Sequence, residues 1–298
     1  MTLALLLPLL MFAAPDAPQA LTVDAAKARI EQIIAASGAE VAVAYAPLTI
    51  QGTTGPRTDR ILIDEEKVFH AASTMKVPVM IEAFRQADEG RFSLDDAVPV
   101  GNTFKSIVDG SLYELSVTED SDGQVYQAIG KTMTVRQLVT AAITVSSNLA
   151  TNILIQKLGP ENVRKTVARL KGDGMVVLRG VEDQKAFDKG MNNATTARAL
   201  MALLGAIARG QAVNAAASRG MSDILRMQQF NDAIPAGLPA DVPVGHKTGT
   251  ITRIHHDAAI VYADKPYVLV VLTRGLDDQK ASAKIMADIS RVIYAIQR

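Results

Sequence analysis

Strand-like sequence is concentrated at the two ends of this chain. Residues 40–48 alternate apolar and small or polar side chains, and residues 60–63 follow as a short return segment. Near the other end, the apolar runs 258–262 and 267–273 flank Ala263-Asp264-Lys265-Pro266, a sequence typical of a tight turn. Strands need partners, so these distant segments are expected to pair in one antiparallel sheet.

The middle of the chain is helical by its apolar periodicity, with one helix capped at Thr134 and another at residues 221–230. Residues 94–130 break this pattern and are expected to form a long irregular surface segment, of a kind that is often functional, and residues 51–59 are expected to form a turn. Further helices are expected near 24–37 and 278–296. The sequence therefore predicts an α+β fold, in which an antiparallel sheet is flanked by the N- and C-terminal helices and carries an inserted all-helical lobe. We expect residues 21–68 and 212–298 to form the sheet lobe and residues 69–211 the helical lobe. An active site is expected in the cleft between the lobes.

The N-terminus begins with an apolar run of about a dozen residues, which is shorter than the ~20 needed to span a bilayer. Such a run followed by small residues is typical of a signal peptide, with cleavage options at Ala14, Ala17 and Ala20. We expect residues 1–20 to be a signal peptide and the protein to be periplasmic or secreted, without stable membrane insertion. The alternative is a misassigned start codon or a disordered tail.

The composition excludes several classes of function. The 298 residues contain no Cys, which excludes disulfides, thiolate metal sites and a Cys nucleophile. The formal net charge is zero, which argues against nucleic acid as a partner. None of the four His residues stands in a metal-binding pattern, so neither a metal nor another cofactor is expected.

Ser73 and Lys76 open an apolar, helix-like run, in which residues three apart share one face. A serine hydroxyl needs an adjacent base to act as a nucleophile. Lys76 could be that base only as the neutral amine, and burial or a nearby cation lowers a lysine pKa. On its own, however, this pattern occurs often by chance.

Two further motifs follow in order, Ser146-x-Asn148 and Lys247-Thr248-Gly249-Thr250. With Ser73-x-x-Lys76 they make the chain, from about residue 21 to 298, resemble the class A β-lactamases and, more broadly, the penicillin-recognising serine hydrolases. One departure is Ser147, since the family usually has Asp there to brace this loop. The resemblance implies the serine β-lactamase fold, in agreement with the fold expected above.

The resemblance also implies roles for these residues. Ser73 would be the acylated nucleophile, Lys76 a base or proton relay, and Ser146 a proton shuttle to the leaving nitrogen. Lys247 would orient Ser146 and depress the pKa of Lys76. The remaining positions would bind the substrate. Asn148 would contact the substrate amide, and the hydroxyls of Thr248 and Thr250, on either side of Gly249, would bind the substrate carboxylate. The N–H groups of Ser73 and Thr250 would form the oxyanion hole.

The family's deacylating water is held by a loop Glu followed by an Asn. Glu182 lies at about the right distance before Thr195 and Thr196, with Asp183 and Asp188 as rivals, and Ala186 stands where the Asn would be. A substrate carboxylate also needs an anchor after the Lys-Thr-Gly strand. We assign this to His256, with His255, Arg253 and Arg274 as alternatives, and expect His70 to be a packing residue.

These expectations combine into a monomeric serine β-lactamase of class A type, which binds a small β-lactam and hydrolyses it through a Ser73 acyl-enzyme. Two alternatives stay open. One is a penicillin-binding peptidase or esterase that turns β-lactams over slowly. The other is a non-catalytic sensor or binding module on the same fold.

Overall fold

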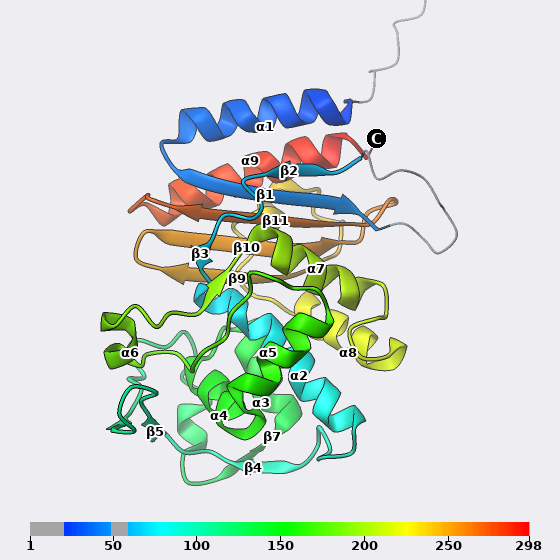
Figure 1. Ribbon diagram of the computed structural model, residues 1–298. Coiled ribbons are helices and arrows are strands. Elements are labelled where there is room, and N and C mark those ends of the chain that lie inside the picture. The colour runs from blue at the N-terminus through cyan, green and yellow to red at the C-terminus, as the bar shows by residue number, and fades with distance from the viewer. Residues whose placement is uncertain (1–20, 49–58, 298) are drawn as a thin grey trace, which may run out of the picture.

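A five-stranded antiparallel sheet forms the upper half of the molecule (Figure 1), in the strand order β2-β1-β11-β10-β9. The computed structural model describes residues 21–48 and 59–297. The sheet strands are β1 (Glu40–Pro47), β2 (Ile61–Ile63), β9 (Val244–Ile251), β10 (Ile254–Val261) and β11 (Tyr267–Arg274). β1 pairs with β11 along its whole length, from Glu40 opposite Arg274 to Pro47 opposite Tyr267. The predicted pairing of the two end segments is therefore confirmed.

The terminal helices α1 (Val23–Ser37) and α9 (Gln279–Ala295) cover one face of the sheet (Figure 1). α1 begins one residue before the predicted cap, because the Thr22 hydroxyl accepts the Ala25 amide. It ends as expected at Gly38, whose φ of 67° is in the left-handed region that glycine adopts without strain. The predicted sheet flanked by both terminal helices is confirmed.

Helices pack against the opposite face of the sheet and below it. They are α2 (Lys76–Asp88), α3 (Val135–Thr144), α4 (Asn148–Leu158), α5 (Pro160–Arg169), α6 (Gln184–Asp188), α7 (Ala197–Ala208) and α8 (Ala215–Arg226). Short 3₁₀ helices are η1 (Ala72–Met75), η2 (Tyr126–Ala128) and η3 (Ile234–Gly237). Short strands pair in twos: β3 (Phe69–His70) with β8 (Ala194–Thr195), β4 (Ala97–Pro99) with β7 (Thr132–Thr134), and β5 (Phe104–Lys105) with β6 (Leu112–Tyr113). α7 contacts β1, β10 and β11 directly.

Both faces of the sheet are buried, which explains why its strands are almost continuously apolar. Along β11, Val268 and Val270 belong to the core shared with the inner helices, whereas Leu269 and Val271 belong to the core beneath α1 and α9. Successive strand residues point to opposite faces. The sheet is thus packed against helices on both faces. Its edge strand β9 lies at one end of the strand order.

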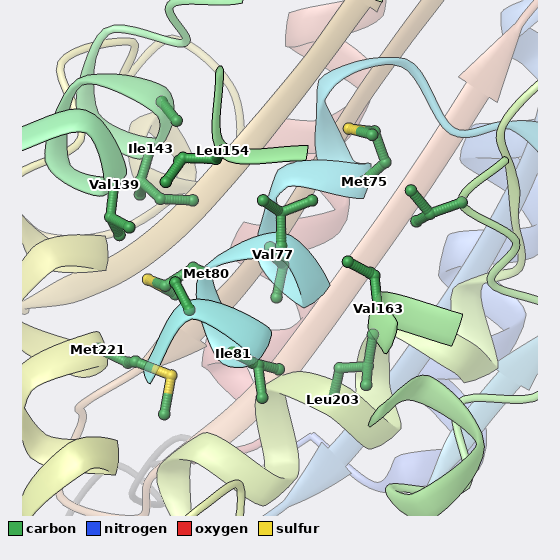
Figure 2. Packing of buried hydrophobic residues seen from close by; sticks show 14 of the residues in the cluster. Met75, Val77, Met80, Ile81, Val139, Ile143, Leu154, Val163, Leu203 and Met221 are labelled. Atoms are coloured by element: carbon green, nitrogen blue, oxygen red, sulfur yellow. The ribbon is translucent and has the colours of Figure 1, made fainter. Parts of the chain in front are cut away.

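α2 is the central helix of the inner core, and Figure 2 shows its apolar side chains surrounded by other helices. Val77, Met80 and Ile81 are almost completely buried. The residues around them are Val139 and Ile143 of α3, Leu154 of α4, Val163 of α5, Leu203 of α7 and Met221 of α8. A side chain at the start of α2 is therefore held by a helix that is surrounded by the core of this lobe.

Three local differences from the sequence analysis stand out. Ser73 lies in η1, and α2 begins only at Lys76. α8 spans Ala215–Arg226 instead of residues 221–230, because the Asn214 side chain accepts the Ala217 amide and caps the helix early. The segment expected to be irregular, 94–130, contains the β5–β6 pair and also β4, which pairs with β7 just beyond the segment.

The predicted signal peptide at residues 1–20 and nearly all of the predicted turn at 51–59 lie outside the described residues. Among the helices of the described ranges, none has both the length and the apolar character required to cross a bilayer. The exact division into a sheet lobe and a helical lobe stays a prediction.

Candidate active site

Ser73 lies in η1, where the tight 3₁₀ turn places side chains three residues apart directly above one another. Lys76 is therefore on the same side as Ser73. The edge strand β9 approaches this turn very closely: a Cβ built on Gly249 would lie 3.1 Å from the Thr74 nitrogen and 3.2 Å from the Ser73 nitrogen. Glycine is what allows the backbones of β9 and η1 to come together, and it brings residue Thr250 beside Ser73.

Ser146 is shared by two buried lysines from different elements. Its hydroxyl accepts from Lys76 Nζ at 3.2 Å and from Lys247 Nζ at 2.9 Å, and its carbonyl accepts from Lys76 Nζ at 2.6 Å. Lys76 is 1 % and Lys247 0 % exposed. Because the hydroxyl accepts from both amines, its own hydrogen is free to be donated elsewhere.

The burial of the two lysines changes their acid–base behaviour. Burial lowers the pKa of Lys76 to about 7, while the negative charges of Asp120 and Glu182 act in the opposite direction. Burial, and next the charge of Lys76, lower the pKa of Lys247 well below its ordinary value. Lys76 can therefore be a neutral amine near neutral pH, as a general base must be.

Asn148 connects this group to Glu182. Its Oδ1 accepts from Lys76 Nζ at 2.8 Å, and its Nδ2 donates to Glu182 Oε1 at 2.8 Å. Glu182 is half-buried, and this burial raises its carboxyl pKa, against the effect of the Asn148 hydrogen bond. A continuous polar chain thus runs from Lys247 through Ser146, Lys76 and Asn148 to Glu182.

The loop that carries Glu182 is held by hydrogen bonds on both sides of this residue. Before it, Gly180 packs on α4, where Asn152 binds both the N–H and the C=O of Val181 at 2.7 and 3.0 Å. After it, the Asp183 carboxylate accepts from the Ser106 hydroxyl at 2.8 Å and from the Ile107 amide at 2.9 Å. The Asp183 carboxylate is thus occupied by hydrogen bonds from the 94–130 segment.

Two cavities of about 280 and 290 Å³ meet at Ser73. Ser73, Asn148 and Thr250 line both of them. The first also contains Glu182 beside His70 and Phe187, and the second contains Ser146, Thr248 and His255. The two cavities are therefore halves of one cleft, with the predicted nucleophile between them. Of the carboxylates considered in this loop, Glu182 and Asp183 border the cleft, and Asp188 does not.

Sequence reasoning missed Asp120. Ser147 lacks the carboxylate that the family resemblance implies for bracing this loop. In the structure the Ser147 hydroxyl accepts only the Ala150 amide, at 3.3 Å, whereas the carboxylate of Asp120 reaches the amides of Asn148 and Leu149 from the 94–130 segment. The available signal was the acidic turn Glu119-Asp120-Ser121-Asp122 in a segment already suspected to be functional.

The assignment of His256 as the carboxylate anchor is contradicted by its surroundings. His256 is 0 % exposed, its Nε2 donates to the His70 carbonyl at 3.0 Å, and its Nδ1 accepts from the Thr273 amide at 3.1 Å. Burial lowers its pKa to about 4, so the ring is neutral near neutral pH. With both ring nitrogens bound to backbone groups, His256 has no atom left to bind a carboxylate.

The alternatives to His256 occupy different places. His255 lines the cleft beside Thr248 and Thr250. Arg274 is paired with Glu40 at 2.5 Å, on β11. Arg253 is exposed at the β9–β10 turn and faces Asp277 at 3.5 Å. Only His255 of this set therefore borders the cavity that contains Thr248.

His70 supports the turn that carries the nucleophile. Its Nδ1 accepts the Ala72 amide at 3.0 Å, and Ala72 has a φ of 45°, which is unusual for a residue with a side chain. Its ring also contacts Phe187 edge-on. These contacts fit the packing role expected for His70, whose side chain also borders the cleft.

Comparisons with known proteins agree with this geometry. Residues 25–297 match a family model described as the beta-lactamase enzyme family. A β-lactamase of Rhodobacter capsulatus is 26% identical over 240 residues, which cover 78% of each chain. A mutant of the last common ancestor of Gram-negative bacteria class A β-lactamase is 25% identical in its solved structure, with a TM-score of 0.76 over 90% of this chain and 97% of that one. A mutant of PBP-A, solved as an acyl-enzyme complex with penicillin G, shares the fold at 22% identity, with a TM-score of 0.75 over 93% and 98% of the two chains.

Proposed function

Because this chain belongs to the β-lactamase enzyme family, we propose that it hydrolyses β-lactams as a class A-type serine enzyme, with Ser73 as the acylated nucleophile. The observation that carries the proposal is the polar chain from Lys247 to Glu182 along a cleft that has Ser73 at its centre. It supplies a base for acylation, a proton donor for the leaving nitrogen and a carboxylate for deacylation.

In the acylation step, Ser73 Oγ attacks the lactam carbonyl carbon and its proton passes to the neutral amine of Lys76. The N–H groups of Ser73 and Thr250 receive the oxyanion, and one such donor is worth about 3 kcal/mol in other enzymes. The C–N bond then breaks, and the Ser146 hydroxyl protonates the nitrogen. The ammonium of Lys76 returns a proton to Ser146, which restores the amine.

In the deacylation step, Glu182 removes a proton from a water molecule that attacks the Ser73 ester. The carboxylate borders the same cavity as Ser73, and Asn148 orients it through the 2.8 Å hydrogen bond. The bond between the acyl carbon and Ser73 Oγ breaks, the proton held by Glu182 passes to the Ser73 oxygen, and the ring-opened acid is released. Thr248 and Thr250 bind the substrate carboxylate, and Gly249 lets them approach.

The second candidate is a penicillin-binding peptidase or esterase that acylates readily and deacylates slowly. The observation in its favour is Ala186, which is fully buried and takes the place of the Asn expected to hold the water together with Glu182. PBP-A, the solved relative trapped as a penicillin G acyl-enzyme, has the same fold. The two candidates differ only in the lifetime of the Ser73 ester.

Time-resolved intact mass measurements after mixing with a penicillin distinguish these functions. The wild-type chain should lose substrate with a brief or absent adduct, and Ser73→Ala should form none. Glu182→Gln should accumulate the adduct, with deacylation slowed about 10²- to 10⁴-fold. Asp188→Asn, an equal charge loss in the same loop but outside the cleft, is the control and should behave as wild type.

A long-lived wild-type adduct would favour the peptidase or esterase. No adduct and no loss of substrate would refute β-lactam chemistry and favour a non-catalytic module. Unchanged turnover in Glu182→Gln would exclude Glu182 as the general base of deacylation.

We also propose that the protein acts outside the cytoplasm, on the basis of the apolar run at residues 3–14. We further propose that it is a monomer. N-terminal sequencing of the protein from its native host tests export, since an intact Met1 in the cytoplasm would contradict it. Sedimentation analysis tests the oligomeric state.

A further inference from the structure

The backbone at Ser146 is held in an unfavourable conformation. Its φ is 60°, in the left-handed region, where a residue with a side chain is destabilised by about 1–2 kcal/mol. Ser146 lies between the end of α3 at Thr144 and the start of α4 at Asn148. Something outside this connection must hold it, since strained residues persist only where their surroundings impose the geometry.

The turn at residues 120–121 contacts the connection on both sides of Ser146. On the N-terminal side, the Ser121 hydroxyl donates to the Val145 carbonyl at 2.6 Å. On the C-terminal side, Asp120 accepts the Asn148 amide at 3.0 and 2.9 Å with its two oxygens, and the Leu149 amide at 3.0 Å. Hydrogen bonds from amides to a carboxylate are stronger than neutral ones, and the start of a helix favours the negative charge.

Asn148 is the residue that this carboxylate holds by its main chain. The side chain of Asn148 in turn connects Lys76 and Glu182. Ser147 cannot replace Asp120, because its hydroxyl is already bound to the Ala150 amide within α4. The backbone on both sides of Ser146 is therefore hydrogen-bonded to a segment that precedes it by about 25 residues.

We propose that Asp120 is a positioning residue for the reaction: with Ser121 it clamps the backbone around Ser146, and so places Ser146 and Asn148 against Lys76 and Lys247. The kinetic consequence rests on the proposed function. The clamp itself is a property of the fold.

The test compares Asp120→Ala with Glu114→Gln, which removes an exposed carboxylate from the same segment outside the cleft. A misplacement of about 1 Å costs about 10²-fold in rate, so the acylation rate constant of Asp120→Ala should fall about 100-fold. Its dissociation constant for a penicillin should change much less, and the fraction of molecules that acylate should stay near one. Glu114→Gln should match wild type, since an exposed charge is screened by salt.

Amide hydrogen exchange supplies the readout that needs no substrate. In Asp120→Ala the amides of Asn148 and Leu149 should lose protection, while those of β11 keep it. An unchanged acylation rate constant in Asp120→Ala would overturn the proposal. So would a fall explained wholly by fewer active molecules, because that would be simple unfolding.

If the wild-type chain forms no acyl adduct, the proposed function fails on that result alone. The proposed positioning by Asp120 and Ser121 is then tested by amide hydrogen exchange alone. Unchanged protection of Asn148 and Leu149 in Asp120→Ala would refute it.

Discussion

Replacing Gly249 with alanine tests whether the close approach of β9 to η1 sets the catalytic geometry. The added Cβ would meet the Thr74 Cγ2 at 3.0 Å, the Thr74 nitrogen at 3.1 Å and the Ser73 nitrogen at 3.2 Å. Ordinary contact begins at 3.4 Å, so the strand must move by a few tenths of an ångström. The two nitrogens are backbone atoms of a turn packed against the core, and they cannot rotate away.

The expected loss follows from this displacement. The shift separates the N–H groups of Thr250 and Ser73, which must lie about 2.7–3.1 Å from the same oxyanion. A 1 Å error costs about 10²-fold, so a few tenths should lower the acylation rate on the order of tenfold, or about 1.4 kcal/mol of transition-state stabilisation. Stopped-flow acylation with a chromogenic cephalosporin measures it.

Gly245→Ala is the matched control, because Gly245 is on the same strand. Its new Cβ would meet the Leu225 Cβ at 3.2 Å and the Arg226 Cγ at 3.3 Å, which are side-chain atoms at the end of α8. Overpacking should destabilise both variants by about 1 kcal/mol, and only Gly249→Ala should lose acylation rate. Equal rates in the two variants, with both folded, would refute the reasoning.

Two further predictions follow from the lysines and from Ser146. Burial lowers the pKa of Lys76 to about 7, and the neutral amine is the active form. The acylation rate measured by stopped flow should therefore rise with pH through 7 and level off above it. A rate that falls over this range would exclude Lys76 as the base. Ser146→Gly and Ser146→Ala both lose the hydroxyl that accepts from Lys76 and Lys247, and acylation should fall about 10²-fold or more in each. Only glycine relieves the strain of the 60° φ, so Ser146→Gly should have a free energy of unfolding about 0.5–1 kcal/mol higher than Ser146→Ala in urea titrations; equal stability of the two variants would show that the backbone is not strained there.

The sequence was sufficient to predict the fold because hydrophobic periodicity and turn chemistry are local signals. The alternation in residues 40–48 and the turn at 263–266 predicted strands that the structure pairs as expected. The start of α8 was misplaced because the capping Asn214 was overlooked, although it is also a local signal. Helix caps were recognised where the apolar pattern was strong, as at Thr134, which forms a capping box with Gln137.

The site was predictable only where the chemistry lies within short motifs. Ser73, Lys76, Ser146, Asn148 and Lys247 are spread over more than half of the chain, and the structure brings them together. Asp120 was missed because its partners are backbone amides, which leave no mark in the sequence. His256 was misassigned because counting along a strand gives the position of a residue, and not the direction of its side chain or its bonds to His70 and Thr273.

The central strand of the sheet, β11, is the last strand in the sequence, and its neighbour β1 is the first. Contacts between residues so far apart make folding slow, because a long loop must close before they form. During synthesis β1 cannot pair with β11 until more than 200 further residues have been made. Until then the apolar strand edge is open to pairing with other chains, and the helical segment between them can assemble first. Truncation within β11 would therefore remove the middle of the sheet and leave β1 without its main partner strand.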